Sequence, residues 1–329
     1  MKILINALPG IGDAIMFSPS LSLLKRRLPD SQIDMLVMFQ QVEQIYRSNK
    51  NLNKVYFIDF LNQSKFKSLK EVLELRKNKY DFSVNIYPMN RKEYNLINFL
   101  TGAKKRIGCS YNNYSFSNLD FLNTNLKQEE KNRHNVLENF DLIKNISEDA
   151  NETELGNYEL NLGKEELDYA EKYIKENNLS GKLLIGFHAG SATFKGHINK
   201  RWASEKFIEL AQRLNAKFQS AIILFGTENE LNERIHKETN KISFIPKVNN
   251  ILESVALIKK CKILVSNDTA LMHLAAAVEV PTVAIFGYTN YKELYPWKNK
   301  YIIVRKELEC SPCFFNSPKP VKCIWTGED

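Results

Sequence analysis

A chain of 329 residues with 43% hydrophobic residues can bury two cores, because domains of about 150 residues are the norm. No apolar run approaches the ~18 residues of a membrane-spanning helix, and the opening MKILINALPG is typical of a buried strand, not of a signal peptide. The net charge of +8 favours an acidic partner or reflects a lysine-rich composition, and no nucleic-acid-binding signature accompanies it. We therefore expect a cytoplasmic protein that does not bind nucleic acid.

Strands and helices alternate through the first half. Apolar, β-branched segments predict strands, and apolar residues three and four apart predict helices. The predicted strands are 2–8, 33–39, 54–59, 81–87 and 105–109, and the predicted helices are 13–28, 66–77, 92–100 and 132–146. Ser18 and Pro19 predict an interruption of the first helix, because proline suits a first helical position. The Asn- and Ser-rich segment 110–130 predicts a long functional loop.

The polar stretch 147–163 indicates a linker, after which the alternation repeats. The predicted strands of this half are 182–188, 220–226, 242–245, 262–267 and 282–287, and its predicted helices are 164–177, 203–215, 228–238, 250–260 and 269–278. This order predicts an α/β protein with parallel sheets covered by helices. We expect domains at 1–160 and 161–329, with a cleft between the carboxyl ends of their strands.

The stretch LPGIGDA (8–14) follows the first predicted strand. A dinucleotide fingerprint requires a glycine where Ile15 stands, and no Gly-Lys-Ser/Thr phosphate loop is present. The turn therefore serves to present Asp13 at the carboxyl end of the strand. The alternative is that Asp13 only caps or charges the N-terminus of the next helix, where aspartate is favoured.

The stretch FHAGSATFKGHINKRW (187–202) lies between a predicted strand and a predicted helix. Its small residues allow backbone N–H groups to approach a phosphate, and the hydroxyls of Ser191 and Thr193 can hydrogen-bond to it. The positive charges that a leaving diphosphate needs are supplied by Lys195, Lys200 and Arg201. The alternative is a solvated basic loop.

The stretch VSNDTALMHLAAA (265–277) ends a strand and opens a helix at Thr269. Free N–H groups at a helix N-terminus bind phosphate, and Thr269 adds a hydroxyl. His273 shares that helix face one turn further on, or else packs in the core. Asp268 would repel a phosphate, so we expect it to cap the helix or to bind a sugar hydroxyl or a backbone group.

In LFGTENE (224–230), Glu228 or Glu230 follows a strand and could accept hydrogen bonds from ribose hydroxyls. The alternative is that the carboxylate only places negative charge at the start of the next helix. Among five cysteines, Cys310, Cys313 and Cys323 are candidate soft metal ligands. The alternative to a metal site is a cluster of reduced thiols. A structural zinc site normally has four ligands, so we predict that no metal is bound.

Taken together, these stretches resemble glycosyltransferase family 9, the bacterial ADP-heptose:lipopolysaccharide heptosyltransferases. GIGDAIMFSPSLSLLKRRLPDSQIDMLV (10–37) is similar to the opening of the family, with Asp13 at its near-invariant aspartate. The segment 80–108 resembles its fourth strand and following helix, and KRW (200–202) its Lys-Arg-Trp-Pro motif. NDTALMHLAAAVEVPTVAIFG (267–287) resembles its nucleotide-binding motif, and the CSPC segment also recurs in many members.

The resemblance implies the GT-B fold, with an acceptor-binding and a nucleotide-sugar-binding Rossmann-like domain. It implies inverting, metal-independent transfer from a nucleotide-sugar, ADP-heptose, with no further cofactor. By position, Asp13 becomes the base or the electrostatic partner of the acceptor hydroxyl, and Lys200 steadies the leaving diphosphate. The positive end of a helix favours the charged form of an aspartate, which makes Asp13 a weaker base. This favours the electrostatic role for Asp13. The predicted donor site comprises Ser191, Thr193, Lys200, Glu228, Asp268, Thr269 and His273.

The chain departs from the family at several points, and FGYTNYKELYPW (286–297) is only loosely similar to its Gly-Pro-Thr-x-Pro motif. Ala203 stands where proline usually follows Lys-Arg-Trp, and Ala270 stands where glycine is common. His188 precedes Ala189 where proline is frequent. These differences bear on the donor sugar and on its base more than on the fold.

The predicted function is transfer of a heptose or related sugar to a lipopolysaccharide-core or other surface-glycan acceptor, which is acidic or lipid-linked. Peripheral contact with the inner membrane face is expected, and the first half, above all 110–130, is expected to hold the acceptor. The alternatives are a nucleotide-sugar epimerase of the same fold and a heptosyltransferase acting on protein. A non-catalytic sugar- or nucleotide-binding protein would keep its function in an Asp13→Ala variant.

Overall fold

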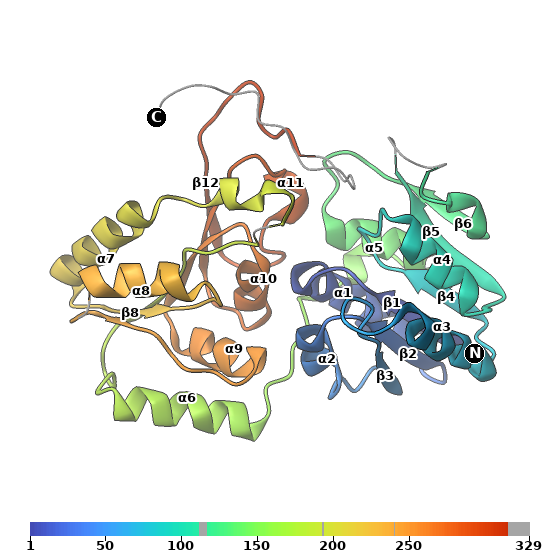
Figure 1. Cartoon of the computed structure of the whole chain (residues 1–329), viewed down its shortest axis with the longest axis horizontal. Helices are drawn as coiled ribbons and strands as arrows, with labels where there is room; N and C mark the ends of the chain where they lie inside the picture. The colour runs from blue at the N-terminus through green and yellow to red at the C-terminus, as the bar shows by residue number, and fades with distance from the viewer. Residues whose placement is uncertain (112–116, 193, 240, 315–329) are drawn as a thin grey trace. The chain divides into compact units, whose positions relative to one another are not determined.

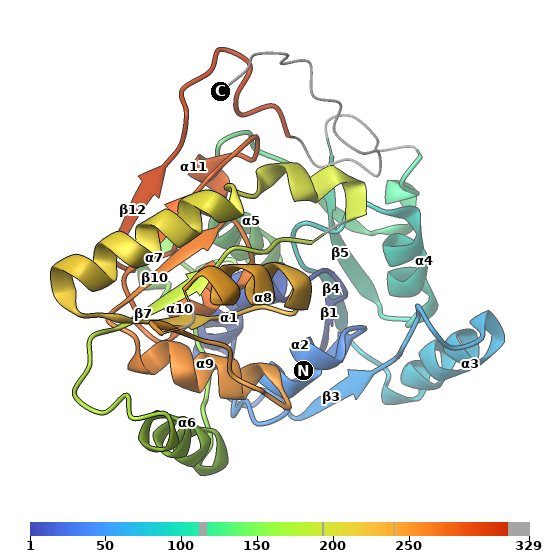
Figure 2. The same cartoon turned by 60° about the vertical axis from the view of Figure 1, so that its left-hand side comes forward.

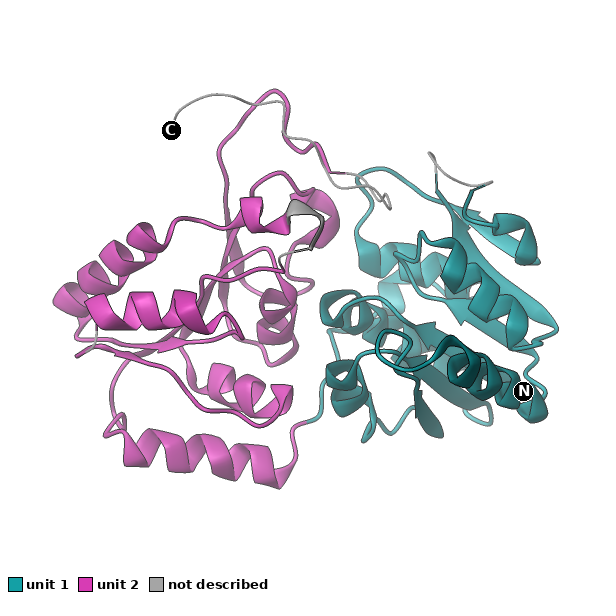
Figure 3. Cartoon of the chain, viewed as in Figure 1, with its two compact units in different colours: residues 1–161, 316–318 teal, residues 162–315, 319–329 magenta. Residues whose placement is uncertain are grey.

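The computed structural model describes residues 1–111, 117–192, 194–239 and 241–314. They form two compact units, drawn in teal and magenta in Figure 3, with unit 1 ending at Asn161 and unit 2 beginning at Leu162. Each unit contains one six-stranded sheet. Along the described part of the chain, no helix is both long enough and apolar enough to cross a membrane.

The sheet of unit 1 has the order β3-β2-β1-β4-β5-β6, with every neighbouring pair parallel (Figure 1). Its strands are β1 (Lys2–Ala7), β2 (Gln32–Val37), β3 (Lys54–Phe57), β4 (Phe82–Asn85), β5 (Lys105–Ser110) and β6 (Asn125–Gln128). Its helices are α1 (Ile11–Arg27), α2 (Gln40–Tyr46), α3 (Lys65–Leu75), α4 (Lys92–Leu100) and α5 (Asn135–Ile143), with short 3₁₀ turns η1 (Arg76–Asn78), η2 (Asp120–Leu122) and η3 (Glu152–Glu154).

The sheet of unit 2 has the order β12-β11-β10-β7-β8-β9 and is also parallel throughout. Its strands are β7 (Leu184–His188), β8 (Ala221–Leu224), β9 (Ser243–Phe244), β10 (Ile263–Asn267), β11 (Thr282–Ile285) and β12 (Tyr301–Val304). Its helices are α6 (Lys164–Glu176), α7 (Ser204–Phe218), α8 (Asn229–Glu238), α9 (Ile251–Lys260), α10 (Ala270–Ala277) and α11 (Tyr291–Leu294), with the 3₁₀ segment η4 (Phe194–Lys200).

Both units share one topology. Numbered within its own unit, each sheet has the strand order 3-2-1-4-5-6, the order of a Rossmann-like domain. The prediction of a GT-B protein with two Rossmann-like domains is confirmed. In such a sheet the direction of strand addition reverses between the first and fourth strands, which are β1 and β4 in unit 1 and β7 and β10 in unit 2. Ligands bind outside the carboxyl ends of the strands at such a reversal.

The central strands are buried because helices cover both faces of a parallel sheet. In unit 1, Ile3 pairs with Ile33, and neither side chain has exposed surface. In unit 2, the Phe187 and Phe207 rings meet edge to face at 5.5 Å, and the Trp202 ring packs on Phe207 at 5.1 Å. These contacts join β7 to the start of α7, so the strand end that carries the candidate donor loop rests on a fixed core.

The prediction that Ser18 and Pro19 interrupt the first helix is wrong. The helix α1 runs unbroken through Pro19. Proline lacks the N–H that would bond to the carbonyl four residues earlier, Ile15. The Ser18 hydroxyl donates to the Ile15 oxygen at 2.7 Å instead, so that carbonyl keeps a partner and the helix continues.

The predicted loop 110–130 and the predicted linker 147–163 are both corrected. The strand β6 lies in the first segment, as an edge strand paired with β5 through Ile107 and Asn125. Its sequence NLKQ has no apolar run to reveal it, and residues 112–116 lie outside the described residues.

The predicted linker 147–163 packs on unit 1, because Leu155 is buried and the Glu159 N–H donates to the Ser18 hydroxyl at 2.9 Å. The sequence patterns also missed α2, α11 and β12.

The helix α4 has its polar and apolar sides reversed. Asn95 and Asn98 are buried, whereas Leu96 and Phe99 are 44% and 45% exposed. Asn98 accepts from Asn6 of β1 at 3.1 Å and donates to Asn123 at 2.8 Å. Buried amides must be hydrogen-bonded, so this network ties α4 to β1 and to the segment after η2.

We expect Asn98→Ala to lower the free energy of unfolding of unit 1 by about 2–4 kcal/mol, because it removes the buried hydrogen bonds that Asn98 makes with Asn6 and Asn123. Leu96→Ala, on the exposed side of the same helix, is the matched control and should change stability by less than about 1 kcal/mol. Urea denaturation monitored by circular dichroism measures both. Equal effects of the two substitutions would contradict the structural role of the network.

Candidate functional site

The candidate donor site lies at the carboxyl ends of β7 and β10, where the strand order of unit 2 reverses. The register pairs Ser266 with His188, so the residues that follow the two strands are neighbours. The His188 ring nitrogen Nδ1 lies 2.8 Å from the Thr269 hydroxyl oxygen. Thr269 is the N-cap residue of α10, and its side chain makes no capping hydrogen bond. The Met272 N–H donates to the Thr269 oxygen at 3.2 Å, and the N–H groups of Ala270 and Leu271 remain available to an anion.

A buried ion pair joins this helix end to the loop after β7. Lys200 Nζ donates to Asp268 Oδ2 at 3.1 Å, and the Thr289 hydroxyl donates to the same oxygen at 2.7 Å. Asp268 is only 3% exposed. Burial alone would raise the pKa of Asp268, but the Lys200 charge and the Thr289 hydrogen bond outweigh it and hold the pKa below its ordinary value. Of the alternatives for Asp268, a cap of α10 is wrong, because Thr269 is the N-cap residue and the Asp268 carboxylate binds Lys200. Binding of a sugar hydroxyl by Asp268 stays a prediction.

His273 lies one turn into α10 and is 3% exposed. Burial lowers the pKa of His273 to about 4; the charge of Asp268 opposes this shift, and that of Lys200 adds to it. The imidazole is therefore neutral at pH 7. The neutral His273 ring therefore packs beside the Lys200–Asp268 pair as a dipole and adds no positive charge to the donor site.

The loop that carries the cations is fastened at both ends by Asn267, which has no exposed surface. Its amide donates to the Ala189 oxygen at 2.7 Å, and its Oδ1 accepts from the Trp202 N–H at 2.9 Å. Arg201 closes the loop internally, donating to the Ser191 hydroxyl at 3.0 Å and to the Ser191 carbonyl at 2.6 Å. Ser191 is thus buried and engaged within the loop, and its contact with phosphate stays a prediction.

Glu228 is the N-cap residue of α8 and faces the same strand ends. Its carboxylate lies 3.6 Å from His188 Nε2 and 3.8 Å from Arg201 Nη2. Burial tends to raise the pKa of Glu228, but His188 and Arg201 together bring it below its ordinary value. A side chain at Gly190 would collide with the carboxylate, and Gly226, at φ +109°, would place a Cβ 2.6 Å from it. Two glycines therefore make room for this carboxylate.

Asp13 lies in unit 1, in the first turn of α1 directly after β1. Gly10 is the N-cap, so Asp13 is not the capping residue, although its carboxylate still faces the positive end of the helix. Tyr94 of α4 lies near it: burial raises the pKa of Tyr94, the Arg91 charge lowers it, and the Asp13 charge raises it. Asp13 follows β1 and Tyr94 follows β4, so both lie at the strand-order reversal of unit 1.

The remaining predicted residues are placed as follows. Thr193 and Cys323 lie outside the described residues. Cys310 and Cys313 are half-buried. Within the described ranges no three His, Cys, Asp or Glu side chains come together as metal ligands would.

Three residues of the donor site were not predicted from the sequence: His188, Asn267 and Thr289. The positions of His188 and Asn267 at the ends of predicted strands were a usable signal, because parallel strand ends meet at one edge. Thr289 follows the last predicted strand of the half by two residues, and nothing local distinguishes it from other loop hydroxyls. Tyr94 was likewise missed in unit 1.

Two tandem units of Rossmann order, with an ion-paired lysine beside a helix N-terminus at the reversal of the second sheet, have the architecture of the GT-B fold. The chain belongs to glycosyltransferase family 9 (heptosyltransferase), whose model matches residues 69–324.

Relatives of this chain carry heptosyltransferase names. It is 27% identical over 328 residues to lipooligosaccharide heptosyltransferase 2 of Campylobacter jejuni subsp. jejuni serotype O:2, covering 95% of this chain and 89% of that one. It is 24% identical to lipopolysaccharide heptosyltransferase 3 of Escherichia coli K12, over 88% and 84% of the two chains.

Solved structures share the fold. The glycosyl transferase family 9 protein of Veillonella parvula superposes with a TM-score of 0.77 at 21% identity, covering 93% of this chain and 86% of that one. The E. coli ADP-heptose lps heptosyltransferase II superposes with a TM-score of 0.75 at 22% identity, over 94% and 92% of the two chains.

The buried His273 predicts a dependence of stability on pH. Its folded pKa of about 4 lies below the unfolded value of 6.5, so the unfolded chain takes up the proton first as the pH falls. The stability is fully present above pH 6.5, and about 3 kcal/mol is lost between pH 6.5 and about 4. Asp268 keeps its charge over this range because its pKa is lowered. We expect the free energy of unfolding of His273→Gln, measured by urea titration between pH 6.5 and about 4, to fall by correspondingly less than that of the wild type.

His236→Gln, on α8, is the matched control for this measurement. His236 contacts the Ser243 hydroxyl and is not part of the donor site. It should keep the steep loss of stability seen in the wild type. An unchanged pH dependence in the His273→Gln variant would contradict the assignment of a neutral buried imidazole.

Proposed function

We propose that this protein transfers a heptose or a related sugar, with inversion, from an ADP-sugar to a lipopolysaccharide-core or other surface-glycan acceptor. The relatives by sequence are named as heptosyltransferases of lipooligosaccharide and lipopolysaccharide. A structure of E. coli heptosyltransferase WaaC contains ADP, and another contains ADP-2-deoxy-2-fluoro heptose. The observation that carries the proposal is the Lys200–Asp268 pair beside the free N-terminus of α10.

In this proposal unit 2 holds the donor diphosphate. The unbonded N–H groups at the start of α10 and the Thr269 hydroxyl bind phosphate oxygens. Lys200 and Arg201 neutralise the charge that grows on the diphosphate as it leaves. Asp268 holds Lys200 in place before the donor arrives, so the lysine needs little reorganisation. Glu228 accepts hydrogen bonds from the ribose hydroxyls, as a carboxylate after a strand end in such a sheet does.

Unit 1 supplies the acceptor side of the reaction. The acceptor hydroxyl oxygen attacks the anomeric carbon, the bond from that carbon to the diphosphate oxygen breaks, and the configuration inverts. Asp13 takes the hydroxyl proton or stabilises the positive charge that develops as the proton leaves. The helix N-terminus favours the charged carboxylate, which strengthens the electrostatic role over that of a strong base.

The same proposal needs no metal ion, since the chain supplies its own cations next to the phosphate site. Lys200 and Arg201 perform the charge neutralisation that a divalent ion performs in other transferases. Arg91, the N-cap residue of α4 near Tyr94, adds a positive charge on the acceptor side, which suits an acidic acceptor. We place the reaction at the cytoplasmic face of the inner membrane, where a lipid-linked acceptor is accessible.

Calorimetric titration with ADP, UDP and GDP tests the donor site. We expect selective binding of ADP, weakened about 10- to 100-fold by Lys200→Ala, because a charge-assisted contact to phosphate is lost. Lys262→Ala, which removes a lysine outside the donor site at the start of β10, is the control and should bind as the wild type does. Affinity that is unaffected by Lys200→Ala, or no nucleotide binding at all, would overturn the donor-site assignment. Thermal unfolding of each variant shows whether it is folded.

Asp13→Asn tests the acceptor side separately. We expect ADP affinity to stay within about twofold of wild type, while sugar transfer falls about 100-fold or more, as for loss of a general base. The release of ADP from ADP-heptose in the presence of a heptose-deficient lipopolysaccharide acceptor measures the transfer. Full activity of this variant would remove Asp13 from the mechanism and leave the donor site untouched.

A further inference from the structure

The helix α3 presents apolar side chains on the side that faces away from the core. Its buried positions are Ser68, Val72 and Leu75. Phe66, Leu69 and Leu73 follow the helical spacing of three and four residues on the opposite side, and they are 79%, 42% and 38% exposed. The helix is therefore apolar where it meets solvent, which its contacts within unit 1 do not explain.

The neighbouring helix α4 continues this surface. It packs beside α3 in unit 1 (Figures 1 and 2). Its reversed polarity places Leu96 and Phe99 outward, and Phe121 of η2, which packs against α4, is 65% exposed. We call the six residues Phe66, Leu69, Leu73, Leu96, Phe99 and Phe121 the α3–α4 apolar face. Large apolar side chains exposed on neighbouring elements are a candidate interaction site.

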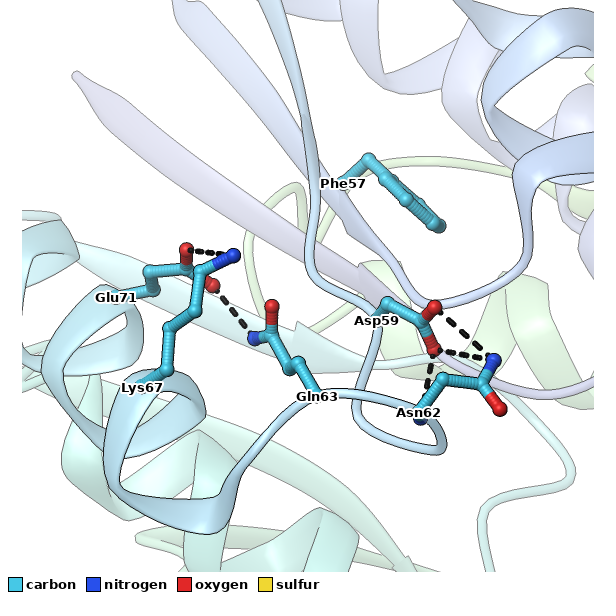
Figure 4. Close-up of a pocket in the computed structure, with 6 residues that line it drawn as sticks. All are labelled: Phe57, Asp59, Asn62, Gln63, Lys67 and Glu71. Carbon is cyan, nitrogen blue, oxygen red and sulfur yellow. Dashed lines mark hydrogen bonds and ion pairs between the residues drawn. The ribbon is translucent and has the colours of Figure 1, made fainter.

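The segment just before α3 is held in place by its own polar contacts. Figure 4 shows the pocket between this segment and α3. Asn62 donates to Asp59 at 3.0 Å, Gln63 donates to Glu71 at 2.7 Å, and Lys67 pairs with Glu71 at 3.8 Å. The polar groups of the pocket thus bond to one another. The start of α3 is fixed, and Phe66 is presented from an ordered helix end.

The part of the chain that carries the α3–α4 apolar face is positively charged. Residues 65–106 contain eleven Lys and Arg against four Asp and Glu. Lys70 and Lys77 are exposed and follow Phe66 and Leu73 by four residues, which places them beside the apolar row. Lysine stems lie along apolar surface while their ammonium groups reach polar headgroups. An apolar row bordered by lysines is the pattern of elements that lie in a membrane interface.

We propose that the α3–α4 apolar face docks on a lipid bilayer with anionic headgroups. The apolar side chains insert at the boundary of headgroups and acyl chains, and the surrounding lysines bind the anionic surface. A second copy of the chain fits less well, because two such faces would bring like charges together. The face includes none of the residues of the donor site or Asp13. The inference therefore stands independently of the proposed transferase activity.

Sedimentation of the full-length chain with lipid vesicles tests this proposal. The probes are vesicles of phosphatidylcholine alone and of phosphatidylcholine mixed with phosphatidylglycerol. We expect binding to the mixed vesicles that high salt weakens, and about 10-fold or greater loss in the variant Phe66→Ser/Leu73→Ser. Lys70→Glu/Lys77→Glu should also reduce binding to the anionic vesicles. Because all four positions are exposed, the variants should keep the thermal stability and the nucleotide affinity of the wild type.

The matched controls lie in unit 2. Phe218→Ser/Ile302→Ser removes apolar side chains that are 49% and 63% exposed, and Lys217→Glu/Lys237→Glu reverses two exposed charges. Both should bind vesicles as the wild type does. Absence of wild-type binding to anionic vesicles, or equal binding by Phe66→Ser/Leu73→Ser, would overturn the proposal. Self-association in sedimentation velocity that Phe66→Ser/Leu73→Ser abolishes, without any preference for anionic vesicles, would assign the face to a second copy instead.

Discussion

The candidate donor site depends on one buried ion pair. A carboxylate as deeply buried as Asp268 stays charged only because Lys200 and Thr289 contact it. The pair also fixes Lys200, the residue at the end of η4, against the N-terminus of α10. Asn267 fastens both ends of the same loop to β10. The cations are therefore held where the strand order reverses, before any anion is bound.

The two units use the same topology for different chemistry. At the reversal of unit 1, the first turn of a helix carries the Asp13 carboxylate, which cancels the positive end of the helix dipole. At the reversal of unit 2, the first turn of α10 carries no acidic residue and begins at Thr269, next to a lysine. One reversal is thus suited to a hydroxyl that loses a proton, and the other to an anion. In the proposed transfer, the acceptor and the donor use these two unlike helix ends.

Unit 1 also departs from the usual division between an apolar interior and a polar surface. Its interior contains a network of asparagines, Asn6, Asn95, Asn98 and Asn123 among them, whose amides hydrogen-bond to one another. Its α3–α4 surface is apolar and surrounded by lysines. Because the buried side of α4 consists of amides, its Leu96 and Phe99 lie on the exposed side.

Local sequence determined the α/β class, most strands and helices, and the candidates Asp13, Lys200 and Asp268, because each of these follows from periodicity or from position after a strand. It did not reveal β6, since an edge strand of sequence NLKQ has no buried face to impose a pattern. It left Asp268 without a partner, because Lys200 is 68 residues away. Only the order of the strands in the sheet decides which strand ends are neighbours, and that order is fixed by crossovers and packing between distant segments rather than by any local preference.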